Sequence, residues 1–263
     1  MLTRGLRVVL VVLLLSVGGG LVGTHPVQYA ASRARCSGLE RADVRGSEPT
    51  YTRNPLAEFR NHKRLCHGVW LPRPRRNLVP QGLAISGRTA WVSGFRYRPG
   101  FGERPCQLMG VDLVTGKRLA FHSAIYGRVG NRPRTYCRHG GGILQRGRWL
   151  WMVESSKLWL VDLRQRSNVL EARRAWRIEA PVRGSAIVAS GDRLGLVPFQ
   201  TKGAANIYWF SMKRVLKRGV LDLAVRREGR TQVGAVASTR IPRLVQGATL
   251  DAAGHLYLSR SNL

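Results

Sequence analysis

The chain has 263 residues, with 44 Lys+Arg against 14 Asp+Glu and a formal net charge of +30. Hydrophobic residues make up 44% of it, which excludes a globally disordered chain, and its 30 glycines show no three-residue period, which excludes a collagen-like one. Of the 44 basic residues, 38 are Arg. This positive charge permits binding to nucleic acid or to an anionic surface, but it does not require either.

Residues 1–34 have the features of an export segment. Arg4 and Arg7 precede an apolar run over residues 8–23, and small residues follow it. The run is short for a membrane span, which needs about 20 apolar residues. We therefore expect a cleaved signal peptide, with an uncleaved anchor through residues 8–23 as the alternative. Either form predicts a secreted or extracytoplasmic protein, and the uncleaved form would be anchored to the membrane by residues 8–23.

Four cysteines follow the export segment: Cys36, Cys66, Cys106 and Cys137. An even number in an exported chain predicts two disulfides, and the sequence order favours Cys36–Cys66 and Cys106–Cys137. Closing either loop of roughly 30 residues would stabilise the fold by about 3–4 kcal/mol. The alternative is a metal site that combines cysteines with His67 or His139, but no CxxC pair supports it.

Residues 35–78 are polar and rich in Arg and Pro, and we expect an extended lead-in with one short helix from Asn54. From residue 79 to residue 263, short apolar or alternating runs are separated by glycine-containing turns, which is typical of strands. This boundary predicts one β-domain over residues 79–263.

One motif recurs four times in this domain: a polar residue, a glycine, a strand, a glycine turn and a second strand. The copies begin at Gln81-Gly82, His139-Gly140, Arg183-Gly184 and Gln246-Gly247, with turn glycines at positions 87, 147, 191 and 254. Further strands follow the hairpins. Four short strands per unit predict an all-β fold, a β-propeller-like repeat of about four four-stranded blades.

Three segments, residues 80–85, 111–117 and 158–163, resemble the strand and turn signatures of secreted bacterial β-propellers. The lactonase-like, gluconolactonase/strictosidine-synthase-like and quinoprotein-like propellers are the families concerned, and the resemblance covers residues 79–263. It implies about five to eight blades, more than the repeats supply. Either residues 50–78 complete a small ring, or the chain is shortened at its C-terminus and the ring is incomplete.

Loops at one rim of a propeller converge on the central channel, so polar residues at repeated positions are candidate ligand contacts. They are Gln81, Ser93, His139, Arg183, Gln246, Ser259 and Asn262. Such a rim would recognise a polar or anionic small ligand. The alternative is that these are turn and strand-end residues that hydrogen-bond to the backbone.

Glu154 follows the apolar run 149–153, where a carboxylate is unexpected unless it is paired or exposed. The resemblance to lactonase-like propellers implies a channel carboxylate that holds Ca²⁺ or another divalent cation, which polarises an ester carbonyl. Glu154 is then the candidate metal ligand, and Glu154 with His139 is the candidate catalytic acid–base pair. No cofactor is expected outside this hydrolase alternative.

Five basic clusters, at residues 73–76, 173–174, 213–214, 217–218 and 226–227, fall in separate loops. We expect them to be spread over the surface, where they could adhere to an anionic envelope polymer or to phospholipid. The aromatic residues lie mostly in strands and predict core packing, so nucleic acid is not an expected partner. The sequence therefore favours a secreted or envelope-attached binding protein, with a hydrolase and an electrostatic polymer binder as alternatives.

Overall fold

A computed structural model describes residues 38–48, 62–72, 78–96, 104–251 and 253–261. This part of the chain is all-β, and its one α-helix is a single turn. No helix within these ranges is long and apolar enough to cross a membrane. The expected export segment 1–34, the expected helix at Asn54, Cys36 and Asn262 lie outside them.

The described residues of the lead-in pack against the first sheet. They include two 3₁₀ turns, η1 (Arg41–Asp43) and η3 (His62–Arg64). The amide of Trp70 donates a hydrogen bond to the carbonyl of Arg45 at 2.8 Å. Val69 and Leu71 pack on a small core of Leu78, Met109 and Val111. These described residues of the lead-in therefore cover part of one face of this sheet.

Three four-stranded antiparallel meanders and one hairpin carry the predicted repeats. The first sheet contains β1 (Leu78–Ser86), β2 (Thr89–Arg96), β3 (Cys106–Asp112) and β4 (Arg118–His122). The second is built on β7 (Ile143–Arg146), β8 (Trp149–Glu154), β9 (Lys157–Asp162) and β10 (Val169–Ile178). The third contains β11 (Ala186–Ser190), β12 (Arg193–Val197), β13 (Ala205–Ser211) and β16 (Ala237–Ile241). The hairpin is β17 (Val245–Leu250) with β18 (Leu256–Arg260).

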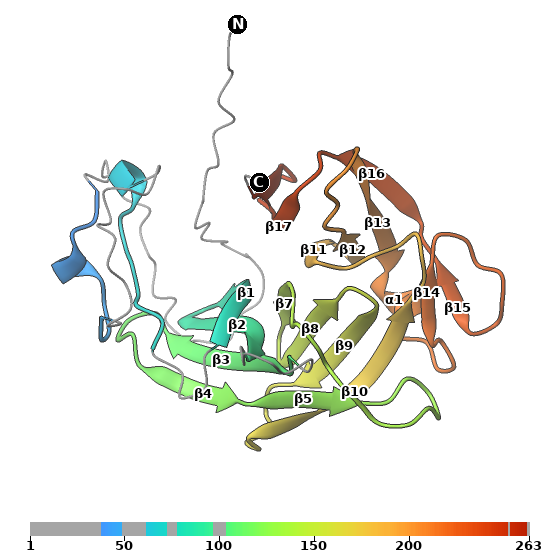
Figure 1. Cartoon of the computed structure of the whole chain (residues 1–263), viewed down its shortest axis with the longest axis horizontal. Coiled ribbons are helices and arrows are strands. Elements are labelled where there is room, and N and C mark those ends of the chain that lie inside the picture. Colours follow the sequence, from blue (N-terminus) through green and yellow to red (C-terminus); the bar gives the residue numbers. More distant parts are fainter. Residues whose placement is uncertain (1–37, 49–61, 73–77, 97–103, 252, 262–263) are drawn as a thin grey trace, which may run out of the picture.

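Each hairpin of the repeat motif turns at a glycine in the left-handed region, with φ of 55° at Gly87, Gly147 and Gly191 and 85° at Gly254. Residues with a side chain rarely adopt this conformation, so the glycines allow the tight turn. The four sheets follow one another along an arc, with β1, β7, β11 and β17 in contact on its inner side (Figure 1). Within the described residues, the arc does not close into a ring.

Two insertions cover the outer edge of β10, and we call them straps. The first strap, residues 123–138, holds β5 (Ala124–Gly127) and β6 (Thr135–Tyr136), and β5 pairs in parallel with Val169–Glu171. The second strap, residues 212–236, lies between β13 and β16. It holds α1 (Met212–Val215), β14 (Asp222–Ala224) and β15 (Gln232–Gly234). Its β14 pairs in parallel with Arg177–Ile178 at the other end of β10.

The main cores lie between consecutive sheets. Between the second and third sheets, the rings of Trp151 and Trp176 stack with centroids 5.4 Å apart beside Phe210. Between the first and second, Trp159 is fully buried with Leu108. The expectation that the strand aromatics form the core is confirmed for these tryptophans. Their large apolar areas supply much of the contact between sheets.

Glycines allow the backbones of three sheets to approach closely on the inner side of the arc. The Gly142 amide donates a hydrogen bond to the Ser185 carbonyl at 2.8 Å, which joins the second sheet to the third. The buried Ser93 hydroxyl donates to the Gly141 carbonyl at 2.6 Å, which joins the first sheet to the second. A Cβ atom at Gly142 would lie 2.6 Å from the Cα of Ala186. The glycine run 140–142 is therefore a packing element.

Replacing Gly142 with Ala should separate the second and third sheets locally. The added methyl group would meet backbone atoms that cannot rotate away, so we expect Gly142→Ala to lower the free energy of unfolding by about 1–3 kcal/mol. Gly229→Ala is the control, because the nearest atom to a Cβ there is 3.9 Å away. Denaturant titration of both variants tests this; equal losses would contradict the role of Gly142.

Candidate functional site

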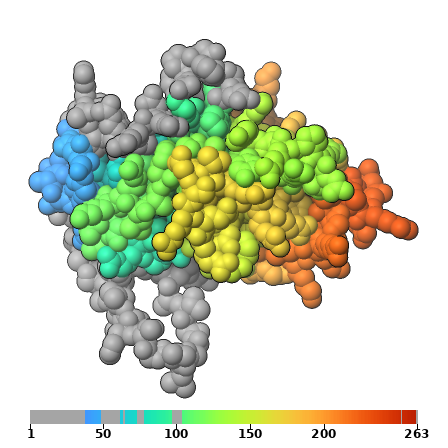
Figure 2. Space-filling view, turned by 90° about the horizontal axis from the view of Figure 1, so that it is seen from below, coloured from blue at the N-terminus to red at the C-terminus, as the bar shows by residue number. Residues whose placement is uncertain are grey.

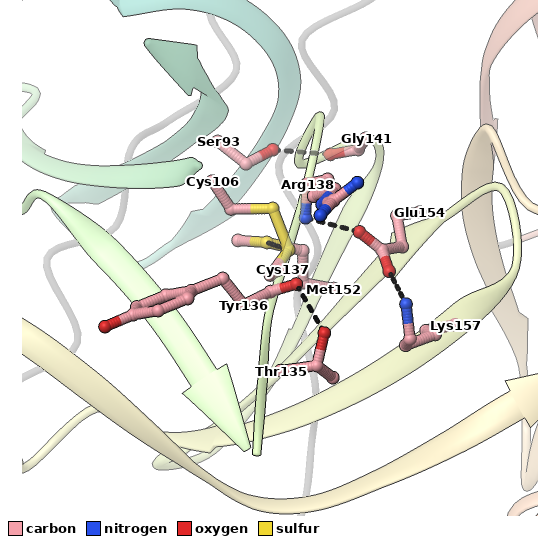
Figure 3. The surroundings of a disulfide bond; sticks show 10 residues. All are labelled: Ser93, Cys106, Thr135, Tyr136, Cys137, Arg138, Gly141, Met152, Glu154 and Lys157. Atoms are coloured by element: carbon pink, nitrogen blue, oxygen red, sulfur yellow. Dashed lines mark hydrogen bonds and ion pairs between the residues drawn. A yellow bond between two sulfur atoms is a disulfide. The ribbon is translucent and has the colours of Figure 1, made fainter. Parts of the chain in front are cut away.

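Glu154, the sharpest candidate from the sequence, is buried and partnered on both carboxylate oxygens (Figure 3). Its Oε2 accepts a hydrogen bond from the backbone amide of Arg138, and its Oε1 lies 3.0 Å from Nζ of Lys157. Burial raises the pKa of Glu154, while the Arg138 amide and the Lys157 ammonium oppose that rise. Glu154 therefore ties the end of the first strap to β8 and to the start of β9.

The surroundings of Glu154 do not fit a divalent cation. Ligand atoms of Cys106, Cys137 and Glu154 lie within 4.8 Å of one another, and this is the one group of three possible metal ligands in the described part of the chain. The two cysteines form a disulfide, as expected, so they offer no thiolate. Cys66 is also disulfide-bonded, and its expected partner Cys36 lies outside the described residues.

His139 lies in the left-handed region, with φ of 64°, and its ring stacks on Phe95 with centroids 4.3 Å apart. Burial and then the charge of Arg104 lower the pKa of His139. No hydrogen bond joins His139 to Glu154, although both lie in described segments. His139 and Glu154 are therefore not hydrogen-bonded to each other, and their role as an acid–base pair stays a prediction.

The expected rim residues are mostly engaged with their own surroundings. Nε2 of Gln81 donates to the Pro80 carbonyl at 3.0 Å, and Nε2 of Gln246 donates to the Ser261 hydroxyl at 3.1 Å. Ser93 is fully buried, Ser259 is half-buried, and Arg183 is exposed. These contacts resemble the alternative given for the rim, in which the residues serve turns and strand ends.

Strand pairing also changes which rim positions correspond. Gln81 and Gln246 occupy equivalent β-bulges, because the ladder passes from Pro80 to Gly82 in one hairpin and from Val245 to Gly247 in the other. When positions are counted back from the turn glycines, the residue of the second hairpin that is equivalent to Gly82 is Gly142, not Gly140. His139 therefore lies two positions before the equivalent of Gln81. The sequence alone aligned Gly140 with Gly247, because both lie seven positions before a turn glycine. The fourth turn is longer than the other three, so equal spacing does not mean equivalent strand positions.

A different site, which the sequence did not single out, lies on the second strap. A hollow of about 750 Å³ is lined by residues of α1, of β15 and of the loops between them. Its lining carries six cationic side chains and no acidic one: Arg214, Lys217, Arg218, Arg226, Arg227 and Arg230. Apolar and uncharged residues complete the lining, including Val220, Val225, Val233 and Ala235. We call this hollow the basic pocket.

Arg174 of β10 holds the loop that forms one wall of the basic pocket. Its guanidinium donates to the carbonyls of Leu216 at 2.6 Å, Lys217 at 3.0 Å and Val220 at 3.1 Å. The same group lies 4.7 Å from the ring centroid of Trp176. Burial and then Arg173 lower the pKa of Arg174. This wall is therefore fixed to the second sheet by charge-assisted hydrogen bonds.

Two acidic residues near the basic pocket, Asp222 and Glu179, are engaged elsewhere, and the exposed Glu228 of the same strap does not line the pocket. Nε of Arg177 lies 2.9 Å from Asp222 Oδ1, and its Nη2 lies 2.6 Å from Glu179 Oε1. Nε2 of Gln232 donates to the other oxygen of Glu179 at 2.7 Å. None of the six lining cations forms an ion pair within the described ranges. Their charge is therefore available to a ligand.

Three basic clusters that we expected in separate loops thus meet in one pocket. They meet because the second strap leaves the third sheet, pairs with β10 through β14, and turns back through β15. A composition signal does exist, since residues 212–236 hold seven basic residues against Asp222 and Glu228. The parallel pairing that folds this segment back has no comparable local signal.

No protein-family profile matches the sequence, and no curated protein matches it either. Among solved structures, the computationally designed Ika4 protein is similar to this chain, with 10% sequence identity and a TM-score of 0.32. The similarity covers 74% of this chain and 97% of that chain. A TM-score this low carries no argument about function, so the site is interpreted from its own geometry.

The raised pKa of Glu154 predicts a pH-dependent stability. The folded state binds this proton more tightly than the unfolded state, so the contribution of the group is greatest below its ordinary pKa of 4.5 and falls as the pH rises through the raised value. Wild type should therefore lose free energy of unfolding relative to Glu154→Gln from about pH 4.5 upward.

Denaturant titrations over a pH series check this prediction. The control is Glu228→Gln, which removes the same charge from an exposed position on the second strap. A wild-type advantage over Glu154→Gln that grows with pH would contradict the assignment.

Proposed function

We propose that this chain is an extracytoplasmic, β-propeller-like binding protein whose anionic ligand is held in the basic pocket. Four consecutive sheets support the propeller part, because each begins with the same hairpin and places its first strand on the inner side of the arc. The buried Cys106–Cys137 disulfide and the expected export segment support an oxidising compartment.

The convergence of six unpaired cations carries the proposal. Side chains placed only to solvate a surface would spread apart, because like charges at close range repel. Five of the six are Arg, whose planar guanidinium binds phosphate, sulfate or carboxylate oxygens in pairs. Partly apolar walls raise the local strength of such contacts. An anion would relieve the repulsion and form several charge-assisted hydrogen bonds at once.

The divalent-cation-dependent hydrolase has no comparable support. Glu154 already has the Arg138 amide and Lys157 as partners, and the neighbouring sulfur atoms form a disulfide. Adhesion to an anionic envelope polymer agrees with the proposal, since such a polymer is one source of the anionic group. In this proposal the polymer binds at the basic pocket and not over the whole positively charged surface.

Inorganic tripolyphosphate is a simple probe for the basic pocket. The triple variant Arg226→Gln, Arg227→Gln, Arg230→Gln removes half of the lining charge without touching the Arg174 wall. Each lost charge-assisted contact contributes roughly 1 kcal/mol or more, so we expect at least about a tenfold rise in the dissociation constant. Isothermal titration calorimetry at about 0.15 M salt measures it.

The matched control is Arg118→Gln, Arg166→Gln, Arg240→Gln, which lowers the net charge equally at exposed residues that do not line the basic pocket. This variant should keep its affinity within about twofold, because distant exposed charges are largely screened at that salt concentration. Equal losses in both triple variants would reduce the binding to a net-charge effect and reject the pocket.

A further inference from the structure

The first strap presents an aromatic pair on the same edge of β10. Tyr126 and Tyr136 face each other across the short β5–β6 ladder, with ring centroids 6.0 Å apart and planes tilted by 55°. Tyr136 is 55% exposed, although buried tryptophans dominate the cores. A cross-strand pair that served only to stabilise the hairpin would gain most by burying both rings. The exposed face of Tyr136 is therefore available to a partner.

Polar groups border these rings. A hollow of about 320 Å³ is lined by Tyr126, Arg134, Thr135 and Tyr136. The guanidinium of Arg134 lies 5.1 Å from the Tyr126 ring centroid and 3.5 Å from Glu171 Oε1. The Tyr126 hydroxyl donates to the other oxygen of Glu171 at 3.4 Å. Both contacts are long and both charged side chains are more than half exposed, so a ligand could engage them at small cost.

An aromatic face bordered by a carboxylate and a guanidinium matches the chemistry of a sugar ring. A pyranose has a face of C–H groups, which packs on the negative face of an aromatic ring. Its hydroxyl groups donate to a carboxylate and accept from a guanidinium. A bare phosphate or sulfate ion would use Arg134 and leave the exposed tyrosine without a role.

We propose that the hollow at Tyr126, Arg134, Thr135 and Tyr136 binds one sugar ring. This inference rests on the proposed function. If the basic pocket holds the anionic groups, the ligand is an acidic glycan that runs along the outer edge of β10 between the two straps. Glu171 pairs with Tyr126 and Arg177 pairs with Asp222, so the two sites are separated by six residues of one strand, roughly 20 Å.

The surface between the two sites suits such a ligand. Arg173 is exposed on β10 between Glu171 and Arg177 and adds a positive charge along the path. Seen from below, the yellow segment that includes β10, the lime segment of the first strap and the orange segment of the second strap are exposed on one face (Figure 2). A linear glycan could therefore contact the sugar site and the basic pocket together.

Three probes distinguish the sugar site from the basic pocket. Two are acidic hexasaccharides, a β-1,4-linked mannuronate hexamer and a heparin-derived hexamer, and the third is tripolyphosphate. We expect Tyr136→Ala to weaken binding of at least one hexamer by about tenfold and to leave tripolyphosphate binding within about twofold. Tyr136→Phe should bind like wild type, because it keeps the ring. Saturation-transfer NMR should show the largest signals on ring C–H protons, and Tyr136→Ala should lose them.

Each result has a defined consequence. The sugar site is overturned if wild type binds neither hexamer, or if Tyr136→Ala binds both hexamers like wild type. It is also overturned if Tyr136→Ala loses its affinity for tripolyphosphate. In these cases the proposed function stands as long as the Arg226, Arg227, Arg230 triple variant loses tripolyphosphate. If that variant keeps tripolyphosphate while Tyr136→Ala weakens a hexamer, the basic pocket fails and the sugar site stands. Matching melting temperatures for Tyr136→Ala and Tyr136→Phe exclude a folding defect.

Discussion

The outer edge of β10 has to be paired, because a ten-residue edge strand would otherwise expose a row of backbone donors and acceptors to other chains. Two insertions from different sheets meet this need, β5 at one end of the strand and β14 at the other. Parallel pairing cannot be reached through a tight turn, so each insertion is long and brings loops with it. Both candidate binding sites are built on those loops, which explains why they lie on one strand edge.

The same arrangement determines where the excess positive charge collects. Acidic residues are few, and near β10 they are used in a partly buried network in which Arg177 contacts Asp222 and Glu179. Partners that are desolvated together are hard to separate, so these carboxylates are not available to neutralise the strap. Arg174 fixes the strap's backbone through three carbonyls. Six cations of the second strap therefore line one hollow with no carboxylate among its lining residues.

Local sequence signals predicted the repeated hairpins and the Cys106–Cys137 disulfide, because turn glycines, alternation and cysteine order act over short distances. The rim alignment from the sequence was shifted by the longer fourth turn, so His139 lies two positions before the equivalent of Gln81. The basic pocket and the Tyr126–Tyr136 pair depend on long-range parallel pairing with β10. A single sequence carries no periodicity for such pairing, and only the density of Arg and Lys over residues 212–236 hinted at it.

The Cys106–Cys137 disulfide makes the first strap a covalent extension of the first sheet. It fastens the end of that strap to β3, so the tyrosine hairpin has an anchor that does not depend on its few hydrogen bonds to β10. Those bonds alone would let a short parallel pair open readily, as weakly held surface segments do. Oxidation thus holds the hairpin against the first sheet, and a chain with both thiols reduced would present the tyrosine pair and the basic pocket with a less fixed spacing.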